Sequence, residues 1–192
     1  MMRRSWIPCV MVIISTMTAC SEPITGTRLV ETPDGRILPQ EDVDPLFRTD
    51  SSSYVLRATD IGWQVRIGAT FTNRTNGTAF IVNCQGGTNV QLEKLVSNGW
   101  VSVWSPFLLA CLSAPIRIPV GGAYQSSVFV FGGYPDNNYA PKFPITDLDG
   151  VYRLKWTQIL SSYDSEALKF GNPLPDEWRV SNRFRLVAER RP

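Results

Sequence analysis

The chain has 192 residues with 19 basic and 17 acidic side chains, a formal net charge of +2, and a hydrophobic fraction of 43%. This length suits one domain with a leader and a tether, and the composition is that of a globular chain. The sequence holds no histidine, which excludes Ser-His-Asp and Cys-His nucleophiles and argues against a zinc site. Arg3 and Arg4 lie in an N-terminal leader that we expect to be removed, and without them 17 basic residues balance 17 acidic ones. We therefore expect no nucleic-acid partner, no metal and no cofactor.

The N-terminus has the features of a secretory leader. Arg3 and Arg4 precede an apolar run of about 14 residues from Trp6 to Ala19, whereas a membrane-spanning helix needs about 20. The run ends Met17-Thr18-Ala19-Cys20, which resembles the lipobox of bacterial lipoproteins. That resemblance implies that residues 1–19 are a removed signal peptide and that Cys20 is acylated and becomes the new N-terminus.

The lipobox resemblance also implies a location. Ser21, rather than Asp, follows the cysteine, and in Gram-negative lipoproteins this favours the outer membrane. Long acyl chains anchor a protein to a membrane without crossing it. We therefore expect the protein to lie in the bacterial cell envelope, anchored through its N-terminal lipid to the outer membrane. The alternative is an ordinary signal peptide, after which Cys20 is a plain thiol.

Residues 20–53 have the composition of a flexible tether. They are rich in Pro, Asp, Glu, Thr and Ser and close with Ser51-Ser52-Ser53, which favours an extended, poorly ordered spacer. The alternative is a small hairpin closed by Asp34-Gly35 between two apolar pairs.

From Tyr54 onward the chain consists of short alternating apolar runs separated by turn residues. The clearest alternation runs from Trp63 to Phe71, and Asn98-Gly99 is a strong hairpin signal between two such runs. We expect strands at residues 62–72, 79–84, 91–96, 100–104, 123–131, 151–160 and 179–187. The predicted fold of residues 54–192 is all-β, an antiparallel two-sheet immunoglobulin-like sandwich of seven to eight strands.

Several short motifs in this region resemble those of the bacterial Ig-like domains of surface lipoproteins. They are Gln91-Leu92-Glu93-Lys94-Leu95 followed by Trp100, then Gly150-Val151-Tyr152-Arg153-Leu154, and Ser181-Asn182-Arg183-Phe184. The resemblance covers about residues 55–187. It implies the fold and the location but no particular activity.

Tyr152 stands just inside a strand after a tight turn. This is the position of a tyrosine corner, whose hydroxyl bonds back to the turn backbone. The alternative is a calcium-binding site, because Asp147-Leu148-Asp149-Gly150 contains half of the D-x-D-x-D-G pattern of a calcium-binding loop. The remaining ligands and the distal Glu of such a loop are missing, so the structural reading is preferred.

Two of the four cysteines remain once Cys9 leaves with the signal peptide and Cys20 is acylated. They are Cys84 and Cys111, an even pair in an oxidising compartment. Neither a C-x-x-C motif nor a histidine supports a catalytic thiol. The pair is predicted to form a structural disulfide.

The expected function is non-enzymatic: a lipid-anchored module that binds or supports an envelope or extracellular protein. The acidic residues are scattered, mostly in turns and the tether, and offer no evident catalytic pair. One alternative is a protease inhibitor acting through an exposed loop, since intracellular proteinase inhibitors of bacilli are similar in fold. Another is glycan binding through the six tryptophans, although Trp63 and Trp156 lie on alternating apolar faces that suit a core.

The predicted contact surface is the long connection at residues 161–177. In an Ig-like order the turns at 73–78 and 161–177 leave the sandwich at the same end. The longer turn, residues 161–177, exceeds the usual connection length. Together with Trp178, which follows it, this turn contributes four candidate partner-binding residues, Tyr163, Leu168, Phe170 and Trp178. The alternatives are a loop folded back over the sandwich edge, or a rival surface at residues 132–146 with Tyr134, Tyr139 and Phe143.

Overall fold

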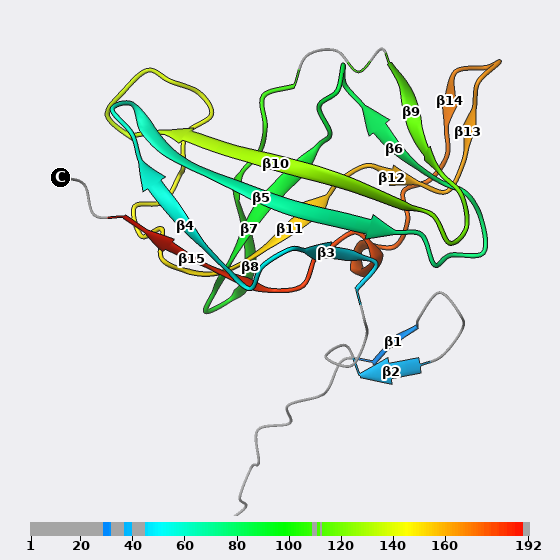
Figure 1. The fold of residues 1–192 in the computed structure, drawn as a ribbon, viewed down its shortest axis with the longest axis horizontal. Helices are drawn as coiled ribbons and strands as arrows, with labels where there is room; N and C mark the ends of the chain where they lie inside the picture. The colour runs from blue at the N-terminus through cyan, green and yellow to red at the C-terminus, as the bar shows by residue number, and fades with distance from the viewer. Residues whose placement is uncertain (1–28, 32–36, 40–44, 109–110, 112, 190–192) are drawn as a thin grey trace, which may run out of the picture.

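The computed structural model describes residues 29–31, 37–39, 45–108, 111 and 113–189 (Figure 1). In these ranges the chain is all-β, as the alternating patterns predict, with fifteen strand segments and one turn of 3-10 helix, η1 (Asp176–Trp178). None of their helices is long and apolar enough to cross a membrane. The predicted signal peptide and Cys20 lie outside the described residues.

The front layer of the sandwich is built on two long strands. β5 (Gly62–Thr72) and β10 (Ala123–Gly133) pair antiparallel over their whole length, and β3 (Phe47–Thr49) pairs with the other side of β5. Alternate residues of β5 face the core, including Val65, Ile67 and Phe71. This is the period-two pattern that the sequence predicts for a strand buried on one face.

The back layer has the order β4-β15-β11-β7-β8. These strands are β4 (Ser53–Ala58), β15 (Phe184–Ala188), β11 (Gly150–Trp156), β7 (Val90–Val96) and β8 (Gly99–Trp104). β4 joins the two layers because it pairs with β5 at one end and with β15 along its length. The β15–β4 pair is parallel, so the sandwich is mixed rather than wholly antiparallel.

A small third sheet covers one end of the sandwich. It has the order β12-β6-β9, from β12 (Ile159–Leu160), β6 (Ala79–Asn83) and β9 (Ser113–Ile118). β13 (Tyr163–Asp164) and β14 (Lys169–Phe170) extend beyond it, at the upper right of Figure 1. In the tether, β1 (Leu29–Glu31) pairs with β2 (Ile37–Pro39), which is the hairpin considered as the alternative to a plain spacer.

The main core is centred on Trp156, which is completely buried. Its ring lies 4.4 Å from that of Phe47, 6.0 Å from Tyr124 and 6.5 Å from Phe71. Because Phe47 belongs to this cluster, and Leu46 is buried with it, the domain begins near residue 45. These residues belong to the stretch 20–53 that the composition assigns to the tether, so the packed structure extends further toward the N-terminus than the expected start at residue 54.

Tyr152 makes the contact expected of a tyrosine corner. Its hydroxyl donates a hydrogen bond to the Leu148 carbonyl oxygen (2.7 Å), and burial raises the pKa of the phenol. Both carboxylates of the half calcium motif have protein partners. Lys94 Nζ lies 3.0 Å from Asp147 Oδ2 and holds the pKa of that carboxyl below its usual value. The Ala188 N–H donates to Asp149 Oδ1 (2.8 Å).

All of the buried hydrophobic side chains in the described part of the chain fall between Leu46 and Leu186. A chain that starts at residue 45 is therefore expected to fold on its own, with the urea midpoint of the chain that starts at residue 21. Phe47→Ala should destabilise it by about 3–5 kcal/mol because a large buried ring is lost. Val120→Ala, at an exposed turn residue, is the control. Equal midpoints for chains starting at residues 45 and 54 would contradict this boundary.

Candidate functional site

The connection after β11 is an ordered antiparallel ribbon, not the open loop that its length suggests. The Leu174 N–H donates to the Ile159 carbonyl (2.8 Å), Ser161 N–H to Asn172 (2.9 Å) and Gly171 N–H to Ser162 (3.0 Å). Tyr163 then pairs with Phe170 across the end of the ribbon. We call residues 159–174 the 159–174 hairpin. Because β12 also pairs with β6, the segments that follow β5 and β11 meet at one end of the sandwich.

Three aromatic rings connect the hairpin to the domain. The Phe80 ring on β6 lies 6.2 Å from that of Tyr163, which lies 5.4 Å from that of Phe170. Phe80 packs in turn on a second small hydrophobic cluster of Val82, Cys84 and Leu160, with Leu108 at its side. Through these rings the hairpin packs against this second cluster.

The predicted disulfide closes this second cluster. Cys84 at the end of β6 is bonded to Cys111, which precedes β9. Cys84 is buried in the cluster, and 27 positions separate the two residues in sequence. In the chain-entropy account, a loop of that size stabilises the folded state by about 3.6 kcal/mol. The bond thus ties β6, on which the hairpin stands, to the chain leading into β9.

The tip of the hairpin is fixed by its own side chains. Asp164 Oδ1 accepts hydrogen bonds from the N–H groups of Glu166 (2.9 Å) and Ala167 (3.0 Å). Leu168 has a φ of +49°, the left-handed region that costs a branched residue roughly 1–2 kcal/mol. Its side chain is nevertheless 71% exposed, and that of the neighbouring Phe170 is 45% exposed. The tip therefore presents two apolar side chains from an ordered backbone.

Arg179 holds the root of the hairpin. Its buried guanidinium donates to the carbonyl oxygens of Trp156 (3.1 Å), Thr157 (2.7 Å) and Leu174 (2.7 Å). It also pairs with Asp176, whose carboxyl is bound by Lys155 on β11 at 2.8 Å. The hydrogen bond from Lys155 is the main cause of the lowered pKa of Asp176. One side chain thus joins the end of β11 to the strand that returns from the hairpin.

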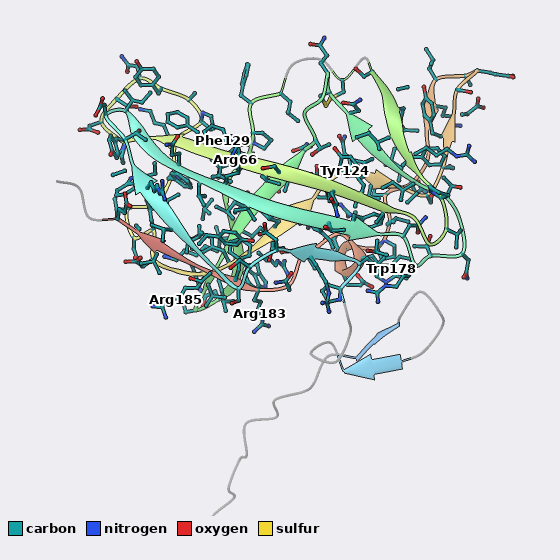
Figure 2. All side chains as sticks on the ribbon, in the orientation of Figure 1. Arg66, Tyr124, Phe129, Trp178, Arg183 and Arg185 are labelled. Carbon is teal, nitrogen blue, oxygen red and sulfur yellow. A yellow bond between two sulfur atoms is a disulfide. The ribbon has the colours of Figure 1, made fainter. Side chains whose placement is uncertain are left out.

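Three of the four predicted contact residues belong to the same hairpin, and the fourth does not. Tyr163, Leu168 and Phe170 lie on or beside β13 and β14. Trp178 lies in η1, where it is half-buried against the main core. Figure 2 shows it at the lower right, away from the hairpin. The structure therefore separates Trp178 from the other three candidates, because the chain has already returned to the sandwich at η1.

The rival surface at residues 132–146 uses most of its aromatic rings for packing. Tyr134 is buried and donates to the Thr59 carbonyl (2.7 Å), and Phe143 is buried in the main core. Tyr139 remains 50% exposed. This end of the sandwich has an open hollow of about 350 Å³, lined by Trp63, Gly133, Pro135, Asp136, Phe143, Ile145, Thr146 and Leu148.

Trp100 and Trp104 lie on different faces of β8, although a spacing of four residues in a regular strand would place them on the same face. A β-bulge shifts the register between β7 and β8, so that Leu92 pairs with Trp104 but Glu93 pairs with Ser102. Trp104 is consequently buried, and its indole N–H donates to the Phe131 carbonyl (2.7 Å). Trp100 stays on the outer face. Such a bulge leaves no clear signal in the sequence.

Sequence reasoning did not identify Asp164 and Arg179, which give the hairpin its shape. Asp164 precedes a short polar stretch, a pattern typical of Asx turns, and this signal was available. Arg179 has no comparable signal, because its partners are backbone carbonyls. In the described ranges no three His, Cys, Asp or Glu side chains gather closely enough to hold a metal ion.

Comparisons with known proteins add little to this geometry. No model of a protein family matches the sequence, and no curated protein matches it. One similar solved structure is the Pseudomonas fluorescens alkylpurine DNA glycosylase AlkC bound to DNA containing an abasic site analog, at 10% identity and a TM-score of 0.34. The match covers 76% of this chain and 32% of that one, so the chain spans about a third of its length. A likeness of this strength carries no argument about function.

Proposed function

We propose that this protein is a lipid-anchored, non-enzymatic module of the bacterial envelope that binds a protein partner through the tip of the 159–174 hairpin. Acylated Cys20 is its proposed anchor. The sequence offers no histidine for nucleophilic catalysis, and this supports a binding role over an enzymatic one.

The single observation that carries the proposal is that Leu168 combines a left-handed backbone conformation with an exposed side chain. A large apolar side chain is held 71% exposed on a backbone conformation that glycine or asparagine would adopt at lower cost. Neither packing nor turn formation explains a leucine at this position. Backbone strain of this kind is concentrated at functional sites, where other interactions maintain it.

The chemistry of the tip indicates the kind of surface it fits. Leu168 and Phe170 supply apolar contact area, and the same tip carries the charged side chains of Asp164, Glu166 and Lys169, with Lys169 opposite Asp164 in the ladder. A protein pocket with apolar walls and a polar rim that offers charges of both signs complements this set. Because the hairpin is ordered before binding, little conformational entropy is lost on association.

The geometry favours this role over protease inhibition. An inhibitor loop offers an extended, unpaired backbone to the enzyme, whereas β13 and β14 use their backbone groups to pair with each other. Glycan binding also lacks a specific observation in its favour, since the Tyr163 ring packs against Phe80.

Replacing Leu168 separates binding from stability. Leu168→Gly should leave the unfolding free energy within about 1 kcal/mol, because relief of the φ strain offsets the entropy gained by the unfolded chain. Phe170→Ala, at a half-exposed ring, should likewise be mild. Each variant should reduce at least tenfold the recovery of the partner that wild type captures from native envelopes after cross-linking. Tyr139→Ala, at an equally exposed aromatic of the rival surface, should reduce recovery by less than twofold. Unchanged capture with both hairpin variants would contradict the proposal.

The anchor is tested separately. Wild-type protein should incorporate labelled fatty acid in cells and fractionate with membranes. Cys20→Ala should incorporate no label, because the acyl acceptor is gone, while Cys84→Ala, which keeps Cys20, should be labelled as the wild type is. Continued labelling of Cys20→Ala would refute the lipoprotein assignment and leave the hairpin proposal standing.

A further inference from the structure

We propose that the outer face of the back layer lies against the membrane and binds the phosphate headgroups of anionic phospholipids. This inference rests on the proposed anchor at Cys20. The face is formed by the outward residues of five neighbouring strands, and we call it the Trp100 face. The members on which the argument depends are Val55, Leu95, Trp100, Val151, Arg185 and Val187.

These residues form a continuous surface because their strands are in register. Leu95 on β7 pairs with Trp100 on β8, and Val151 on β11 pairs with Arg185 on β15. Val187 pairs with Val55 across the parallel β15–β4 ladder. The four aliphatic side chains are all more than a third exposed. The outer face of the front layer differs, because polar residues such as Gln64, Thr70 and Gln125 predominate there.

The arginines of the Trp100 face leave it with surplus positive charge. Arg153 is neutralised by Glu93 at 2.6 Å and lies over the Trp100 ring at 4.4 Å. Arg183 lies over the same ring at 5.8 Å. The structure records no ion pair for the exposed side chains of Arg183 and Arg185 among the residues it describes. Figure 2 shows both side chains pointing away from the sandwich at its lower edge.

The end of the tether meets the domain beside these arginines. Phe47 bridges to Ser181, and Thr49 exchanges two hydrogen bonds with Asn182, at 2.8 and 2.9 Å. The chain therefore enters the domain one residue from Arg183. Only 24 residues separate Cys20 from Pro45, and the pairing of β1 with β2 within this stretch shortens its reach. A lipid on Cys20 would thus keep this edge of the domain close to the bilayer.

The chemistry of the Trp100 face matches the headgroup region. A guanidinium binds phosphate oxygens through paired hydrogen bonds, tryptophan favours the membrane–water interface, and aliphatic side chains gain by leaving water. The tip of the 159–174 hairpin lies on the other side of the view in Figure 1 from β15. Contact between this face and the membrane would leave the hairpin free for its partner.

The test measures how much of the protein sediments with phospholipid vesicles at low salt. It uses the chain from residue 21, which contains the whole domain but carries no acyl group. This chain should bind phosphatidylcholine vesicles that contain phosphatidylglycerol and not pure phosphatidylcholine vesicles. Each arginine near an anionic surface changes the affinity about fivefold, so Arg183→Gln combined with Arg185→Gln should weaken binding about 25-fold. Raising the salt concentration to about 0.5 M should abolish binding.

Arg66→Gln is the matched control, because Arg66 also lies over an aromatic ring, Phe129 at 5.1 Å, but on the front layer. It should bind vesicles as wild type does. Absence of binding, equal binding to both vesicles, or equal losses in the Arg66 and double variants would overturn the inference. So would a concentration-dependent dimer that the double variant abolishes, since a second copy would then be the occupant. Vesicle binding is measured without the partner, so its failure is distinct from loss of capture by the hairpin variants.

Discussion

The position of the candidate site depends on the buried guanidinium of Arg179. A buried charge is costly unless it is paired and hydrogen-bonded, and this one binds three carbonyl oxygens and the Asp176 carboxylate. Its partners come from the end of β11 and from the segment that returns after the hairpin. The hairpin is also held by the pairing of β12 with β6 and by the contact between the Phe80 and Tyr163 rings. Arg179 fixes the root of the hairpin, so that residues 159–174 leave the sandwich as an ordered ribbon rather than as a long surface loop.

The domain consequently has two parts with different roles. The core around Trp156 stabilises the two main layers, and it includes Phe47 from the segment that joins the tether. The smaller cluster around Cys84 supports β6 and, through Phe80 and Tyr163, the hairpin. The Cys84–Cys111 bond reinforces this second part. The proposed membrane face and the proposed partner site lie in different parts of the domain, and β15 and the hairpin tip are far apart in the view of Figure 1.

The sequence predicted the features that depend on local pattern. The alternation in β5, the Asn98-Gly99 hairpin and the pairing of Cys84 with Cys111 are confirmed. Features that depend on tertiary contacts were missed. Phe47 lies in a polar, Pro-rich stretch of the sequence, but it packs in a core most of whose residues come from much later in the chain. The bulge that turns Trp104 inward, and the carbonyls that bind Arg179, have no local signature. Trp178 was assigned to the contact surface because it follows the long connection directly in the sequence. The sequence does not show that the chain has returned to the sandwich by that residue.

The central claim is that the 159–174 hairpin is ordered before any partner binds and that Arg179 is responsible. Amide hydrogen exchange of the free protein tests it most directly at Ser161 and Gly171, whose N–H groups bond across the ribbon. We expect both amides to be protected in wild type. In Arg179→Lys, which loses the planar fork of donors, both should exchange at least tenfold faster while the amides of β5 stay unchanged. Exchange of Ser161 and Gly171 at the unprotected peptide rate in wild type would contradict the account.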